Sequence, residues 1–160
     1  MNKYFTILLF ALLSIYDLKA CTCNRIIPMS EAISKSNIII VGKILEKEIV
    51  QFQNGKAGRI IPEDSLLDFD GIIKAIYKVQ IVEKYKGKLK QNIITLITGL
   101  GNGDCGYSFS IGNEYVIYAS KQTNKVLPIG INIFSTNICT RTIPKNEAEL
   151  QELRQILKKF

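Results

Sequence analysis

The feature that most constrains this chain is a pair of cysteines separated by one residue, Cys21-Thr22-Cys23, directly after Ala20. Residues 1–20 have the pattern of a secretory signal: Lys3 is the positive start, residues 5–15 are an apolar run, and Ala20 is the small residue before the cut. The run is too short for a stable transmembrane span. Cleavage after Ala20 is therefore predicted, and the mature chain would begin at Cys21 with a free α-amine.

A lipoprotein signal is the alternative, because Leu18, Ala20 and Cys21 fit a lipobox, although Lys19 does not. Lipid modification would block the amine and use the Cys21 thiol. All four cysteines lie after residue 20, and an even number in an exported chain is typical of disulfides, which favours simple cleavage. We expect a secreted or extracytoplasmic protein, with lipid anchoring through Cys21 as the alternative. Four cysteines leave three pairings open.

Residues 21–160 are enough for one domain with a hydrophobic core, and a single domain is expected.

The whole chain has 21 Lys+Arg and 14 Asp+Glu, and residues 1–20 hold Lys3, Lys19 and Asp17, which leaves 19 against 13, or +6. Such a surplus can attract acidic extracellular polymers or nucleic acid, mainly by raising association rates, but a simple solvated basic surface is the favoured interpretation. Lysines cluster in residues 84–90, where a charged loop is predicted.

The chain contains no histidine, so it cannot build a Ser-His-Asp or Cys-His nucleophile or a histidine-based zinc site. The cysteines lack the paired C-x-x-C spacing of structural zinc sites. The glycines of residues 99–103 are not followed by the Lys-Ser/Thr of a phosphate loop, and the carboxylates of residues 63–70 have no visible partner. We therefore expect no enzyme activity, no cofactor and no metal bound to the free protein.

Strand patterns dominate the mature chain. Apolar runs and alternation predict strands over residues 37–51, 72–84, 92–98, 114–120 and 129–138. Gly42 indicates a bulge in the first strand, and Asn54-Gly55 and Gly58 indicate turns before an irregular segment over residues 59–71.

Helices are predicted only at the two ends of this pattern. Residues 30–36 form a short one with Ser30 as its cap. A C-terminal helix begins after Asn146 and has an apolar face that should pack on the sheet, formed by Leu150, Leu153, Ile156 and Leu157. The fold class expected is mainly β, a five-stranded Greek-key barrel of the OB type with a short N-terminal helix and a C-terminal helix.

Several motifs occur in the order found in one known family. They are Cys21-Thr22-Cys23, Pro28, Ala32, Asn37-Ile38-Ile39-Ile40, Gly42-Lys43, Tyr85-Lys86-Gly87, Cys105-Gly106-Tyr107, Glu114-Tyr115-Val116-Ile117-Tyr118-Ala119 and Thr136-Asn137-Ile138-Cys139. Over residues 21–143 the chain resembles the netrin-like module and, more narrowly, the N-terminal domain of the tissue inhibitors of metalloproteinases.

The resemblance implies a disulfide pairing and a mechanism. Cys21 would pair with Cys105, and Cys23 with Cys139. The α-amine and carbonyl of Cys21 would chelate the catalytic zinc of a metalloprotease, and Thr22 would enter the adjacent specificity pocket. The implied contacts with the protease continue through Cys23 and Asn24 and include the neighbouring residues Gly103, Asp104 and Cys105.

The chain departs from the animal inhibitors in two respects: Ser34 stands near the place where their third bridge begins, and their second cysteine-rich domain has no counterpart in this sequence. Two other functions remain open. One is a netrin-like extracellular binding module that inhibits nothing and is either free or anchored as a lipoprotein. The other is a nucleic-acid-binding OB fold using Tyr107, Phe109, Tyr115 and Tyr118; an exported chain makes a nucleic-acid partner unexpected.

Overall fold

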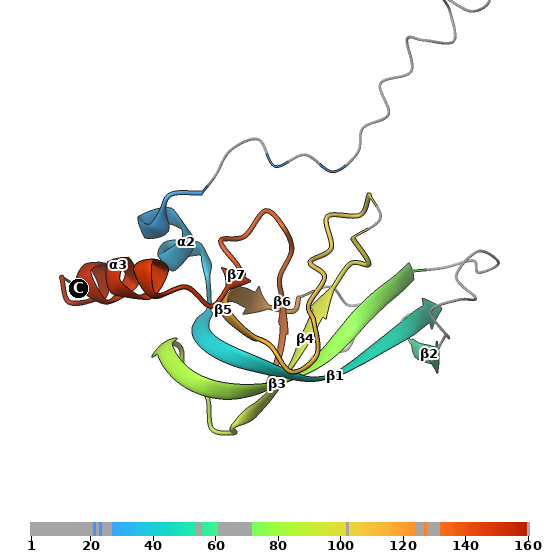
Figure 1. Cartoon of the computed structure of the whole chain (residues 1–160). Helices are drawn as coiled ribbons and strands as arrows, with labels where there is room; N and C mark the ends of the chain where they lie inside the picture. Colours follow the sequence, from blue (N-terminus) through green and yellow to red (C-terminus); the bar gives the residue numbers. More distant parts are fainter. Residues whose placement is uncertain are drawn as a thin grey trace, which may run out of the picture.

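The centre of the fold is a closed ring of strands. The computed structural model describes residues 21, 23, 27–53, 56–60, 72–101, 103–123, 127 and 132–159. Around the ring the strands are β1 (Ile38–Gln53), β3 (Ile72–Lys86), β4 (Ile93–Thr98), β6 (Ile133–Ser135) and β5 (Glu114–Lys121), and β5 pairs back to β1 (Figure 1). The β4–β6 pair is parallel and the others are antiparallel. The predicted OB-type barrel is confirmed.

Two short strands outside the ring were not predicted. β2 (Lys56–Ile60) pairs with the end of β1, and β7 (Ile143–Pro144) pairs with β5. The turn predicted at Gly58 is therefore wrong, because this residue lies within β2. Strand pairing to the end of β1 outweighs the local turn preference of glycine. The predicted turn at Asn54-Gly55 and residues 61–71 of the irregular segment lie outside the described residues.

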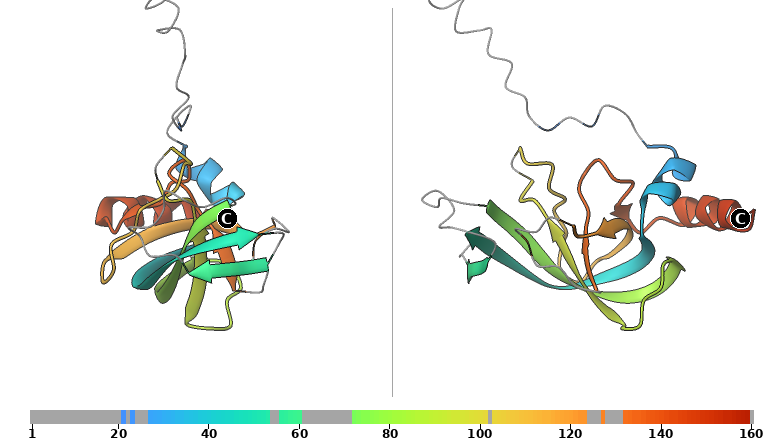
Figure 2. Two further views of the ribbon diagram at one scale, coloured as in Figure 1. Left: turned by 90° about the vertical axis from the view of Figure 1, so that its right-hand side faces the viewer. Right: turned by 180° about the vertical axis from the view of Figure 1, so that it is seen from behind.

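The remaining strand limits differ slightly from the prediction. β3 runs to Lys86, so the charged loop is confined to residues 87–92. β6 covers three residues of the predicted strand 129–138, of which residues 129–131 are not described. The loop at 87–92 lies on the side of the barrel opposite α2 and the β4–β5 connection (Figures 1 and 2).

The continuous apolar run that opens β1 is explained by burial on both of its faces. Ile38 and Ile40 point into the barrel, whereas Ile39 and Val41 pack outside it against the two helices. Successive side chains of a strand point to opposite faces, so a strand covered on both sides has no polar position. β5 follows the same rule, with Ile117 inside the barrel and Tyr118 under the helices.

The bulge predicted at Gly42 is confirmed. The β1–β3 register shifts between Val41 and Gly42, and a Cβ at this position would collide with the side chains of Val79 and Ile117. Glycine at this position therefore lets β1 bend while it pairs with β3 and β5 at once.

The helices lie together on one side of the ring, at the β1–β5 pair. The N-cap of α2 (Met29–Lys35) is Pro28, with no capping side chain, so the prediction of Ser30 as its cap is wrong. Proline suits this place because its fixed φ begins the helix without losing a needed donor. α3 (Glu147–Leu157) begins as predicted, with the Asn146 side chain accepting from the amides of residues 148 and 149. In the described part of the chain, neither helix has the length and apolar character to cross a bilayer.

Replacing Leu153 tests the packing of α3. This side chain is fully buried with Met29, Ile39 and Val116. We expect Leu153→Ala to lower the free energy of unfolding by about 2 to 5 kcal/mol, because it removes buried methyl groups and leaves a cavity. Ile111→Ala, at a mostly exposed position, is the control and should change it by less than about 0.5 kcal/mol. Equal urea midpoints for the two variants would contradict this packing.

Candidate functional site

Two loops project from the same side of the barrel as α2 and carry the cysteines that pair with the N-terminal segment. They are residues 99–106, after β4, and residues 136–142, after β6 (Figures 1 and 2). We call these two loops, together with Cys21 and Cys23, the ridge.

Both disulfides predicted from the family resemblance are present. Cys21 pairs with Cys105 and Cys23 with Cys139, each with a Cα–Cα distance of 5.2 Å. The bridges join residues 84 and 116 positions apart, for which the chain-entropy model gives about 4 to 5 kcal/mol each. The sulfurs of Cys21, Cys105 and Cys139 lie within 4.8 Å of one another, so the bridges are neighbours. All four cysteines are in disulfides, so their sulfurs are not thiolates that could bind a metal ion.

The first ridge loop is organised by the carboxylate of Asp104. It accepts hydrogen bonds from the amides of Leu100 (2.9 Å), Gly101 (2.9 Å) and Gly106 (3.1 Å). Lys74 of β3 lies 3.5 Å from the same carboxylate. Partial burial raises the pKa of Asp104, but the three amides and then Lys74 lower it by more, so this pKa lies below its ordinary value. The ionised carboxylate therefore holds the loop closed.

The backbone of Cys105 has a φ of +59°, in the left-handed region that residues other than glycine rarely adopt. Such a conformation costs about 1 to 3 kcal/mol and persists where its surroundings enforce it. Here the enforcing contacts are the bridge to Cys21, the Asp104 bonds, and the amide of Ile138, which donates to the Cys105 carbonyl at 3.0 Å. Gly106 is needed next to it, because a Cβ there would collide with the backbone of Gly99. The two ridge loops are thus joined by a backbone bond.

The second ridge loop is closed by side chains to which the sequence analysis assigned no structural role. The Asn137 side-chain oxygen accepts from the amides of Cys139 (2.8 Å) and Thr140 (3.1 Å). The hydroxyls of Thr136, Thr140 and Thr142 lie 2.8 to 3.0 Å from one another, and Thr136 donates to the carbonyl of Tyr118. The asparagine turn has a recognisable local signature. The threonine triangle has none, because it depends on where the loop meets β5.

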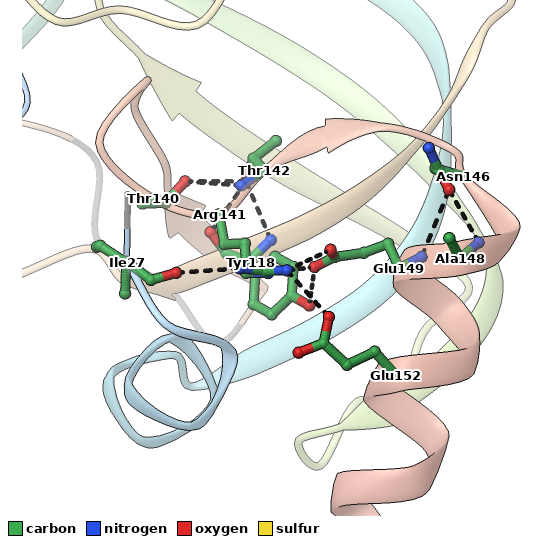
Figure 3. Close-up of polar contacts among 9 residues, drawn as sticks. All are labelled: Ile27, Tyr118, Thr140, Arg141, Thr142, Asn146, Ala148, Glu149 and Glu152. Carbon is green, nitrogen blue, oxygen red and sulfur yellow. Dashed lines mark hydrogen bonds and ion pairs between the residues drawn. The ribbon is translucent and has the colours of Figure 1, made fainter. Parts of the chain in front are cut away.

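A pocket of about 380 Å³ lies beside the Cys23–Cys139 bridge, lined by Ile27, Arg141, Thr142 and Glu149 among others. A smaller one, of about 160 Å³, lies beside Cys105 and is bordered by Lys74 and Asp104. Figure 3 shows Arg141 and Glu149, which were also not singled out from the sequence. They are eight residues apart, in a loop and a helix, and no periodic pattern pairs them.

The remaining predicted site residues are distributed as follows. Gly103 is exposed in the first loop with φ of +90°, and Asp104 and Cys105 follow it on the ridge. Thr22 and Asn24 lie outside the described residues. The structure therefore brings together Cys21, Cys23, Cys105 and Cys139 and places Gly103 and Asp104 next to them.

The aromatic residues proposed for nucleic-acid binding are in the wrong place for it. Phe109, Tyr115 and Tyr118 are buried, and Tyr107 packs against the barrel cluster with its ring centroid 4.5 Å from that of Phe109. Bases stack on exposed rings. Phe109, Tyr115 and Tyr118 belong to the buried core, and the partly buried Tyr107 packs against the barrel cluster next to Phe109.

The sequence model of the family described as tissue inhibitor of metalloproteinase matches residues 19–146, which include both bridges and the whole ridge. A search among curated proteins found no match.

The role of Asp104 predicts a dependence of stability on pH. The pKa of the folded-state carboxyl is below its ordinary value of 3.8, so the ionised form stabilises the fold above that value. This contribution is lost as the pH falls through the lowered pKa. At neutral pH, Asp104→Asn should cost about 1 kcal/mol, because the amide cannot accept from three donors as a carboxylate does.

Urea unfolding between about pH 7 and pH 2 measures this effect. The wild-type protein should lose more stability on acidification than Asp104→Asn, and the two curves should converge at the acidic end. Glu48→Gln, at an exposed position of β1, is the control and should follow the wild type. Parallel curves for wild type and Asp104→Asn would show that this carboxylate does not hold the loop.

Proposed function

Since the chain belongs to the tissue inhibitor of metalloproteinase family, we propose that it inhibits zinc metalloproteases by presenting Cys21 to their catalytic zinc. Members of this family are inhibitors and not enzymes, and they are extracellular. The observation that carries the proposal is the double attachment of the N-terminal segment: both cysteines of Cys21-Thr22-Cys23 are bonded to ridge loops.

The chemistry follows from a free N-terminus at Cys21. The catalytic zinc of a metalloprotease keeps one position for water or substrate. The amine nitrogen and carbonyl oxygen of one residue close a five-membered ring on such a metal and displace that water. An α-amine titrates near pH 7.7 to 8.0, so its neutral form is available at physiological pH at small cost. The protein then blocks the zinc without performing a reaction.

Preorganisation supports this mechanism. A chelating group that is already held in place loses little conformational entropy on binding. Cys21 is tied to Cys105, whose backbone is fixed by the Asp104 bonds and by the amide of Ile138. Thr22 would enter the specificity pocket next to the zinc. Cys23 and Asn24 would extend along the cleft, with Gly103, Asp104 and Cys105 as the neighbouring contacts.

The proposal includes export and removal of residues 1–20, since a blocked or extended N-terminus cannot chelate. The protein would then be secreted or extracytoplasmic with a single domain over residues 21–160. Mass spectrometry of the exported protein tests this step. A first residue of Cys21 with an unmodified amine is expected, whereas an acylated Cys21 would exclude chelation and indicate a lipid-anchored protein.

A netrin-like binding module that does not inhibit is the second candidate. It is favoured by the position of the lysine-containing loop 87–92, which lies on the opposite side of the barrel from the ridge (Figure 1). An acidic extracellular polymer bound there would leave the ridge free. Binding to a sulfated polysaccharide that weakens with salt, together with no inhibition of any metalloprotease, would favour this function.

Adding one alanine before Cys21 tests chelation directly. Residues 21–160 are refolded with both bridges, with and without the extra residue, and inhibition of a metalloprotease catalytic domain is compared. We expect a loss of at least about 100-fold in affinity, because the α-amine is moved away from the zinc while the ridge contacts remain. Far-ultraviolet circular dichroism and disulfide mapping control for folding. Unchanged potency would contradict the role of Cys21.

A further inference from the structure

Arg141, in the second ridge loop, connects three separate parts of the molecule through one guanidinium group (Figure 3). Its Nε and Nη2 donate to the two oxygens of Glu149 in α3, at 2.6 and 2.8 Å. Nη2 also reaches Glu152 at 3.3 Å. Nη1 donates in the other direction, to the main-chain carbonyl of Ile27 at 3.1 Å. The C-terminal helix is thereby linked to the segment that follows Cys23.

The helix side of this link is rigid. Glu149 is buried, it lies in the first turn of α3, and its amide is bonded to the side chain of Asn146. The hydroxyl of Tyr118 donates to Glu149 Oε1 at 2.7 Å. Burial, and then the bond to Glu149, raise the pKa of this tyrosine well above its ordinary range, so the hydroxyl remains a donor. The bond to Glu149 also raises the pKa of Arg141, which stays charged.

The other side of the link is the N-terminal segment. Arg141 is two residues after Cys139, so one short loop holds this segment twice: covalently at Cys23 and by a hydrogen bond at Ile27. The pocket beside the bridge lies between these two attachments. After Ile27 the chain enters α2 through Pro28, whose carbonyl accepts the first helical bond from Ala32. Ile27 is therefore the last described residue between α2 and the Cys23–Cys139 bridge.

The packing of the barrel and α3 does not require this bond to Ile27. α3 is held by Leu150 and Leu153 in the core and by its Asn146 cap. The second ridge loop is held by Asn137 and the threonine triangle. Arg141 is partly buried, and an arginine fork bound to a buried carboxylate has a fixed orientation. Its Nη1, which does not bond to Glu149, is therefore held in the direction of the Ile27 carbonyl.

We propose that Arg141 is a positioning residue: with Glu149 it fixes the Ile27 carbonyl and so sets the position of Ile27 relative to the bridge at Cys23. Its importance for inhibition rests on the proposed function, but its effect on the segment does not. The pair adds a third fixed point to the two bridges. Without it, the Ile27 carbonyl would lose this anchor, and Ile27 would keep its packing against the cluster under the helices.

Hydrogen exchange on the exported protein tests the positioning. Arg141→Lys keeps the positive charge opposite Glu149, but its single ammonium group cannot replace the separate guanidinium nitrogens that bond Glu149 and Ile27 at the same time. Arg141→Gln removes the charge as well. Arg154→Gln is the matched control, because Arg154 also joins α3 to a neighbour, through Glu83 and Tyr85 of β3 and not through the Ile27 carbonyl. Exchange in residues 21–27 should be about tenfold faster in both Arg141 variants and unchanged in the control.

A structural role alone would increase exchange throughout the molecule or affect all three variants alike. Either result, or wild-type exchange in residues 21–27 of Arg141→Lys, would overturn the proposal. If Arg141→Gln fails to fold, Arg141→Lys carries the test, since it retains the ion pair with Glu149.

Inhibition measured on the same proteins separates the two proposals. If the wild type inhibits a metalloprotease, Arg141→Lys should weaken the inhibition about tenfold. Its melting temperature should equal that of Arg154→Gln, so that the loss is not one of stability. Equal inhibition by Arg141→Lys and wild type would overturn the positioning role. If the wild type inhibits no metalloprotease, the proposed function fails, while faster exchange confined to residues 21–27 would still support the position assigned to Arg141.

Discussion

The two neighbouring disulfides are the constraint on which the rest of the ridge depends. They connect Cys21 and Cys23 to loops 84 and 116 positions later, so both of these residues are tied covalently to the barrel. The two bridges require that two loops lie side by side on one side of the barrel. They do, because β4 and β6 run parallel and end on the same side, with residues 99–106 after β4 and residues 136–142 after β6.

Each ridge loop is fixed by a different kind of polar group. Asp104 gathers three amides around one charge in the first, and three threonine hydroxyls with Asn137 close the second. These groups satisfy backbone donors that have no strand partner, which is what irregular backbone requires. Rigid loops in turn allow the bridges to hold a defined geometry, and a defined geometry is what a chelating N-terminus would need to bind without a large entropic cost.

Sequence patterns were sufficient for the barrel because its strands are strongly patterned. The double-sided burial of β1 and β5 appears as continuous apolar runs, and Gly42 and Asn146 have local signatures that the structure confirms. β2, β7 and the limits of β6 were missed, since short strands form where a neighbour pairs with them and not from their own residues. The disulfide pairing came from the family resemblance. Arg141, Glu149 and the threonine triangle could not be found, because their contacts exist only once the loop, α3 and β5 have been brought together.

The central claim is that Cys21 itself becomes a ligand of the target's zinc. Cobalt substituted for that zinc gives a visible spectrum that reports its coordination, so the most direct measurement is a titration of a cobalt-substituted metalloprotease catalytic domain with protein beginning at Cys21. We expect a saturable spectral change at one equivalent, with water replaced by a nitrogen and an oxygen and the metal becoming five-coordinate. Tight binding with an unchanged cobalt spectrum would contradict it.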